Sequence, residues 1–131
     1  MPPKKNTTQK SKLLTEVELE LMQIIWRLNG ATVHEVMAAL PKDRKLAYTS
    51  VSTMLRIMEQ KKFLKAKGTE GRGHVYMPTL NKKEYELTSV NHLVQKVFGG
   101  APETLIRRLV DNGSLSPEEI RNIRQILDER K

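Results

Sequence analysis

The stretch that decides the fold is Tyr48-Thr-Ser-Val-Ser-Thr-Met-Leu-Arg-Ile-Met-Glu-Gln-Lys-Lys62. Projected as a helix at about 100° per residue, it gathers its apolar side chains in one narrow arc: Val51, Met54, Leu55 and Met58. The opposite side carries Thr49, Thr53, Arg56 and Gln60, with Ser52 beside them. Short hydroxyl side chains allow a helix to approach base edges closely, and an arginine can reach a phosphate or a guanine edge. The stretch therefore predicts a helix that buries one face and reads DNA with the other.

The flanking segments place this helix in a recognisable order. Two helices, the second of them short, are predicted before it, because Thr15-Glu-Val-Glu18 and Thr32-Val-His-Glu35 are capping boxes. Gly30 and Pro41 are expected to end these helices. After it, residues 64–67 and 74–77 are expected to be strands, joined by a glycine-rich tip at 68–73. Three helices followed by a hairpin are typical of a winged helix-turn-helix, whose third helix enters the major groove.

The last third of the chain predicts three more helices: one from Asn81 to the Gly99-Gly100 pair, one at 102–110, and one that begins at Ser116-Pro-Glu-Glu119. These short helices carry more apolar positions than they can easily bury alone, which favours a homodimer over a small intramolecular core. The candidate dimerisation residues are Val90, Val94, Val97, Leu105, Leu109, Ile120, Ile123 and Leu127. The chain is thus expected to be mainly α with a small β-hairpin wing: a flexible basic tail at 1–12, a winged-helix DNA-binding domain at 13–80 and a helical dimerisation domain at 81–131.

Charge is concentrated where DNA contacts are expected. The 131 residues have a net charge of +8, which points to a polyanionic partner, with nucleic acid ahead of an anionic membrane. Residues 42–72 hold nine basic residues against three acidic ones, whereas residues 81–131 hold nine against eight. This difference suggests that the basic segment faces phosphates and that the charge-balanced segment faces protein. The side chains assigned to the DNA backbone are Lys45, Tyr48, Gln60, Lys61, Lys62, Lys65, Lys67, Arg72 and His74.

Several classes of function are excluded or disfavoured. The chain has no cysteine, which removes disulfides, thiolate metal sites and cysteine nucleophiles. Its three histidines, His34, His74 and His92, fall on different predicted elements, so we expect neither a metal site, nor a cofactor, nor an enzyme. No apolar run approaches the roughly 18 residues of a membrane span, and the lysine-rich start is not followed by an apolar stretch. We expect a cytoplasmic protein without membrane insertion.

Three segments resemble the penicillinase and methicillin-resistance repressor (BlaI/MecI) family: Leu14–Trp26, Leu46–Leu55 and Gly73–Pro78. The similarity continues more weakly through 97–100 and 115–120 to the final helix. The resemblance implies a homodimeric transcriptional repressor, active in a β-lactam-resistance type of system, whose winged helix binds operator DNA. It also implies that Thr49, Ser50 and Thr53 read bases, and we group Arg56 with them. Its operator is expected to be a palindrome, because a twofold dimer reads two symmetric half-sites.

The chain departs from the family pattern in two places. Copper-responsive relatives carry a carboxy-terminal cysteine pair that is missing here, so thiolate copper sensing is excluded. The β-lactam repressors are cut by a membrane sensor protease at an Asn-Phe bond near the glycine pair, where this chain has Ala101-Pro102. We expect any cleavage within Val97-Phe-Gly-Gly-Ala101, at Val97-Phe98 or Phe98-Gly99. Release by a small ligand or a protein partner, and a winged helix used as a protein–protein adaptor, stay open as alternatives.

Overall fold

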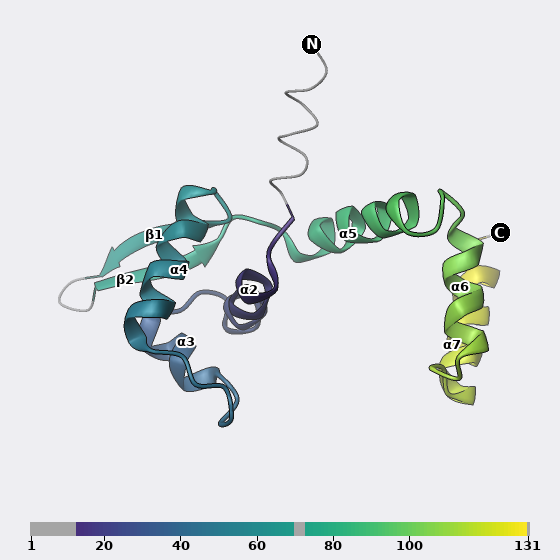
Figure 1. Ribbon diagram of the computed structural model, residues 1–131, viewed down its shortest axis with the longest axis horizontal. Helices are drawn as coiled ribbons and strands as arrows, with labels where there is room; N and C mark the ends of the chain where they lie inside the picture. The colour runs from purple at the N-terminus through teal and green to yellow at the C-terminus, as the bar shows by residue number, and fades with distance from the viewer. Residues whose placement is uncertain (1–12, 70–72, 131) are drawn as a thin grey trace, which may run out of the picture. The chain divides into compact units, whose positions relative to one another are not determined.

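The computed structural model describes residues 13–69 and 73–130 (Figure 1). The predicted basic tail at 1–12 and Arg72 therefore lie outside the described residues. The chain divides into two compact units, one up to Thr88 and one from Ser89 onward. The domain boundary predicted between residues 80 and 81 stays a prediction.

Three helices begin the first unit: α2 (Glu16–Leu28), α3 (Val33–Ala39) and α4 (Tyr48–Gln60). Both predicted capping boxes are present. In the first, the Glu18 amide donates to Thr15 Oγ1 at 3.2 Å and the Thr15 amide donates to Glu18 Oε1 at 2.9 Å. Thr32 and Glu35 repeat this exchange at the start of α3. These local bonds satisfy backbone amides that would otherwise lack partners, which is why the sequence fixes both helix starts.

Strands β1 (Leu64–Thr69) and β2 (Gly73–Pro78) form an antiparallel hairpin after α4. A third segment touches the hairpin at one point, where Ala31 and Tyr76 exchange backbone hydrogen bonds of 3.0 and 2.8 Å. The order helix, helix, helix, hairpin confirms the predicted winged helix. Some boundaries differ: β1 and β2 are both longer than the predicted strands at 64–67 and 74–77. Helix α4 ends at Gln60, before the predicted Lys62, because Lys62 adopts a φ of 72° that turns the chain into β1.

The core of the first unit lies between the three helices and the hairpin. The predicted apolar stripe of α4 is buried in it at Val51, Leu55 and Met58, and Met54 packs at its edge. The remaining core residues are Leu21, Met22, Ile24, Ile25, Ala31, Val33, Val36, Phe63, Leu64 and Tyr76. Because one face of α4 is committed to this core, its other face is held toward solvent.

The second unit contains the second half of α5 (Lys82–Lys96), then α6 (Pro102–Asp111) and α7 (Pro117–Glu129). The helix start predicted at Ser116 is also present and forms a capping box: Ser116 and Glu119 exchange bonds of 2.8 and 3.0 Å. Neither α6 nor α7 has a buried residue. The chain is mainly helical with one small hairpin, as predicted, and none of the helices in the described part is long and apolar enough to cross a membrane.

Candidate nucleic-acid interface

The outer face of α4 carries the residues predicted to read bases. Thr49, Ser50, Thr53 and Arg56 are all exposed, while Ser52 is half-buried. Among the described residues, none of these four exposed side chains makes a hydrogen bond or an ion pair with the rest of the chain. Their donors and acceptors are therefore available to an external partner, on a helix whose opposite face is anchored in the core.

Most of the side chains predicted to contact phosphates are exposed. Lys65 and Lys67 alternate along β1 with Leu64 and Ala66, which pack against the core, so the strand turns both ammonium groups outward. The other exposed members of the set are Lys45, Gln60, Lys62 and His74. Exposed cationic side chains thus occur both on α4 and on the wing, and such side chains suit a polyanionic partner.

Tyr48 lies at the first position of α4 and is 44% exposed. Its ring packs against the His34 ring of α3 in a tilted arrangement, with ring centroids 4.8 Å apart. This contact joins the two helices of the helix-turn-helix on their outer side. Sequence reasoning missed His34, because no spacing pattern connects a residue of α3 with the start of α4.

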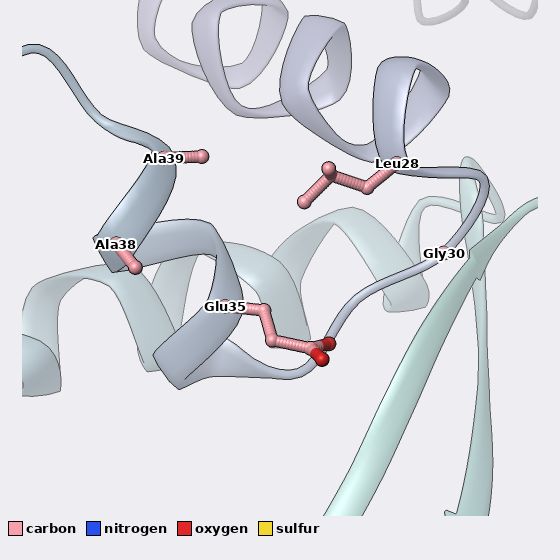
Figure 2. Close-up of a pocket in the computed structure, with 5 residues that line it drawn as sticks. All are labelled: Leu28, Gly30, Glu35, Ala38 and Ala39. Atoms are coloured by element: carbon pink, nitrogen blue, oxygen red, sulfur yellow. The ribbon is translucent and has the colours of Figure 1, made fainter.

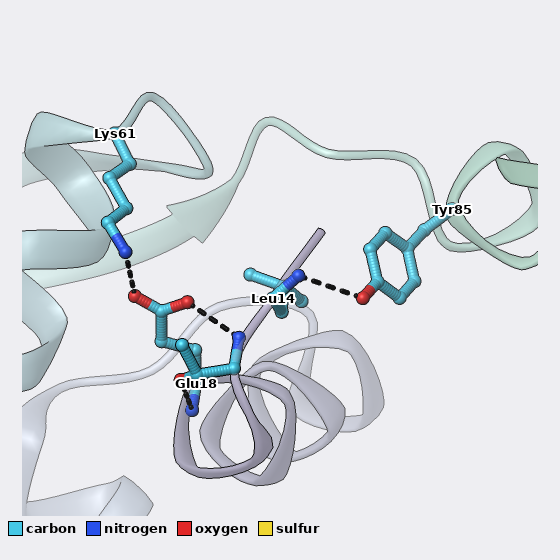
Figure 3. Close-up of polar contacts among 5 residues, drawn as sticks. Leu14, Glu18, Lys61 and Tyr85 are labelled. Atoms are coloured by element: carbon cyan, nitrogen blue, oxygen red, sulfur yellow. Dashed lines mark hydrogen bonds and ion pairs between the residues drawn. The ribbon is translucent and has the colours of Figure 1, made fainter. Parts of the chain in front are cut away.

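Lys61 has a different environment from the other lysines (Figure 3). Its Nζ lies 2.7 Å from Oε2 of Glu18, whose side chain is only 2% exposed. Burial raises the pKa of the Glu18 carboxyl, but the hydrogen bond from Lys61 and that from the Thr15 amide outweigh it, so the pKa is lowered overall. Lys61 thus fastens the end of α4 to the start of α2, a role that the sequence did not reveal.

Arg44 is a second basic residue with an internal partner. Its Nε and Nη2 donate to the two carboxylate oxygens of Glu20 at 2.8 and 3.1 Å, and this pairing raises the pKa of Arg44. The bidentate pair ties the loop before α4 to α2. It therefore helps to fix where α4 begins.

The predicted dimerisation residues differ in exposure. Val90, Val97 and Leu127 are exposed, and Val94 is 7% exposed. Leu105, Leu109, Ile120 and Ile123 are half-buried. Sequence reasoning left out four further exposed apolar residues of this unit: Leu93, Ile106, Val110 and Ile126. They occupy the same amphipathic helices, so the apolar periodicity could have found them.

The segment predicted for cleavage lies between α5 and α6. Val97 is 65% exposed and Phe98 is half-buried. Gly99 and Gly100 adopt φ values of 59° and 87°, in the left-handed region that favours glycine. Pro102 is the first residue of α6, so the Ala101-Pro102 bond joins directly onto a helix.

A pocket of about 390 Å³ lies between α2 and α3, lined by Leu28, Gly30, Glu35, Ala38 and Ala39 (Figure 2). Glu35 is the charged residue of this lining, and its carboxylate accepts the Thr32 amide at 2.9 Å. The pocket thus lacks the convergent polar groups that catalysis requires. No group of three or more His, Asp or Glu side chains suited to a metal ion occurs within residues 13–69 and 73–130.

Comparison with known proteins gives matches along nearly the whole chain. The family model for penicillinase repressors matches residues 14–129. A penicillinase repressor of Bacillus licheniformis is 29% identical over 118 residues, which cover 90% of this chain and 91% of that protein. The methicillin resistance regulatory protein MecI of Mammaliicoccus sciuri is 22% identical over 117 residues, 89% of this chain and 94% of that one. A solution structure of monomeric Bacillus licheniformis BlaI in complex with the blaP half-operator is 30% identical, with a TM-score of 0.47, and covers 56% of this chain and 88% of that chain.

Proposed function

Because this chain belongs to the penicillinase repressor family, we propose that it is a sequence-specific DNA-binding transcriptional repressor that acts in the cytoplasm as a homodimer on a palindromic operator. Family membership confirms the resemblance inferred from the sequence, and it agrees with the expectation that the chain is a regulator and not an enzyme. The outer face of α4 is the observation that carries the proposal.

On that face, Thr49, Ser50 and Thr53 contact base edges, and Arg56 reaches a guanine edge or a phosphate. The support is their exposure, their freedom from internal hydrogen bonds and ion pairs, and the burial of Val51 on the other side of the helix. Small hydroxyl side chains leave room for the helix to enter the major groove. The lysines of the wing neutralise phosphates and hold the register without reading sequence.

The test begins with selection of preferred duplexes from a random pool, using the full chain. Affinity for the selected operator and for a scrambled duplex is then measured over a range of salt concentrations. We expect log affinity to fall linearly with log salt for both duplexes, with a large gap between them. The double variant Thr49→Ala/Thr53→Ala should lose most of that gap. An unchanged preference in this variant would show that α4 is not the reader, and absence of any preference would favour the protein–protein adaptor.

Dimerisation rests on the second unit. Of its described residues only Val94 is buried, while α6 and α7 expose Ile106, Val110 and Leu127 among others. One buried side chain is a small intramolecular core for three helices, which supports a second copy of the chain as the partner that covers these faces. A twofold dimer of this kind reads two symmetric half-sites. Light scattering at micromolar concentration should give twice the mass of the chain, and a monomeric mass would contradict this part of the proposal.

Release from DNA occurs by proteolysis near the glycine pair, with a membrane sensor protease as the candidate partner. The cut falls at Val97-Phe98 or Phe98-Gly99, since Val97 is exposed while Pro102 already belongs to α6 and lacks an amide hydrogen. Fragment masses of the protein recovered from cells exposed to a β-lactam test this site. A cut at Ala101-Pro102 would contradict the steric argument. An intact chain released from DNA would favour a small ligand or a protein partner instead.

A further inference from the structure

His34 lies in the first turn of α3, the helix that precedes α4 in the helix-turn-helix. Val33 and Val36 of the same helix are buried in the core, whereas the His34 side chain is exposed. The capping box of Thr32 and Glu35 fixes the backbone of this turn as well. His34 therefore projects into solvent from a backbone that the core and the cap both hold in place.

The imidazole of His34 is supported on one side and free at its nitrogens. Its ring packs against the Tyr48 ring, with centroids 4.8 Å apart and planes tilted by 40°. Among the described residues, neither ring nitrogen takes part in a hydrogen bond or an ion pair. The adjacent acid, Glu35, is turned to the backbone, where its carboxylate accepts the Thr32 amide at 2.9 Å. The nitrogens of His34 are thus available to a group outside the chain.

Tyr48 connects this imidazole with the base-reading end of α4. It is the first residue of the helix, and Thr49 and Ser50, two of the proposed base-reading residues, follow it directly. In a helix-turn-helix, the N-terminal residues of the second helix contact base edges while the first helix crosses the DNA backbone. A side chain of α3 that packs against the first residue of α4 is therefore expected to lie beside a phosphate at the border of the groove.

We propose that His34 is a further DNA-binding residue, which donates a hydrogen bond from a ring nitrogen to a phosphate of the operator backbone while the Tyr48 ring holds the imidazole in position. The inference rests on the proposed DNA-binding function and adds a residue of α3 to that surface. An imidazole carries an N–H donor whether it is neutral or protonated, so either form can make this contact. Since a phosphate carries no sequence information, the contact contributes to the affinity for every duplex.

The test separates the ring of His34 from its nitrogens. His34→Phe keeps an aromatic ring against Tyr48 and removes both nitrogens. Fluorescence anisotropy measures binding of the full chain to the selected operator and to the scrambled duplex, and circular dichroism measures the melting temperature. Hydrogen bonds to charged groups are among the stronger ones, so we expect the variant to lose about tenfold in affinity for both duplexes, with an unchanged melting temperature.

His92→Phe is the matched control, because it makes the same exchange at an exposed position of α5, outside the helix-turn-helix. It should leave both affinities within about twofold of wild type. If His34→Phe does not fold, His34→Leu takes its place, since leucine also lacks a donor.

A folded His34→Phe protein that binds both duplexes as tightly as wild type would overturn the inference, because the ring would then serve only the packing of α3 against α4. Weaker binding to the operator alone would also overturn it, since that result would assign His34 to base reading. A wild-type protein that binds neither duplex would instead overturn the proposed DNA-binding function. The two kinds of failure are distinguishable, because the last one needs no variant to be seen.

Discussion

Replacement of Lys61 by methionine should destabilise the first unit more than replacement of its partner Glu18 by glutamine. The Glu18 side chain is 2% exposed and that of Lys61 is 43% exposed, so only the lysine can recover water when the pair is broken. Loss of one partner from a fully buried pair costs about 3–5 kcal/mol, and an exposed pair contributes about 0–1 kcal/mol. For Lys61→Met we therefore expect the free energy of unfolding to fall by about 2 kcal/mol, because a buried carboxylate is left without its cation.

Glu18→Gln should cost only about 1 kcal/mol, since the amide oxygen can still accept the Thr15 amide and Lys61 can turn to solvent.

The two variants also differ in their response to pH. In the wild type the folded-state pKa of Glu18 is lowered, so its stabilisation is present at neutral pH and is lost as the pH falls below the ordinary value and through the folded-state pKa. Without Lys61, burial should raise the pKa of Glu18. Protonation then removes the buried negative charge and with it part of the cost of the substitution. The difference in the free energy of unfolding between wild type and Lys61→Met should therefore become smaller in acid.

Urea unfolding of the full chain measures these differences. Trp26 is the single tryptophan of the chain and lies on α2 with Glu18, so its fluorescence reports on the first unit. All variants are compared at one protein concentration, because the stability of a dimer depends on it. The reasoning would be refuted if both variants lost the same free energy of unfolding. It would also be refuted if the difference in that free energy between wild type and Lys61→Met grew from neutral pH to about pH 4.

Three further predictions follow from particular residues. Gly30→Ala should lower the free energy of unfolding by about 2 kcal/mol, because its φ of 109° is unfavourable for alanine and a Cβ there would overlap the side chain of Met77. Gly68→Ala, where a Cβ meets no atom within 4 Å, is the control, and an equal loss there would contradict the explanation. Lys65→Ala should weaken binding to all duplexes alike and reduce the slope of log affinity against log salt by about one, whereas an effect on the operator alone would assign Lys65 to base reading. Leu127→Glu should raise the dissociation constant of the dimer at least about tenfold in sedimentation, while Asn122→Glu on the other side of α7 should not; similar effects from both would place the interface elsewhere.

The fold was largely predictable because its signals are local. A capping box depends on two side chains three residues apart, and Thr15, Thr32 and Ser116 each begin a helix as the sequence indicates. The buried stripe of α4 follows from spacing alone, so the exposure of Thr49 and Thr53 on its other side was predictable as well. The end of α4 was not, since the positive φ of Lys62 comes from the turn into β1 and Lys is not a residue that favours it.

The contacts that position the site were not predictable, because they join residues far apart in the chain. Glu18 has the sequence context of an ordinary helix-start acid, yet its buried carboxylate accepts a hydrogen bond from Lys61, 43 residues away. Tyr85 has the spacing of an apolar residue in α5, yet its hydroxyl binds the amide of Leu14, 71 residues away. Each side chain also fits a second, purely local interpretation, so a single sequence offers no means of choosing between them.

The bridge between Ala31 and Tyr76 bears on how the edges of the hairpin are protected. A two-stranded hairpin has two edges with unpaired backbone groups, and either edge can add a strand from another molecule. The bridge occupies part of the β2 edge, using both backbone groups of Tyr76. The β1 edge pairs with no further strand among the described residues, but Lys65 and Lys67 place two charges along it. Charge of this kind repels a second wing of the same sequence, so we expect the lysines predicted to contact phosphates also to oppose extension of the hairpin into an intermolecular sheet.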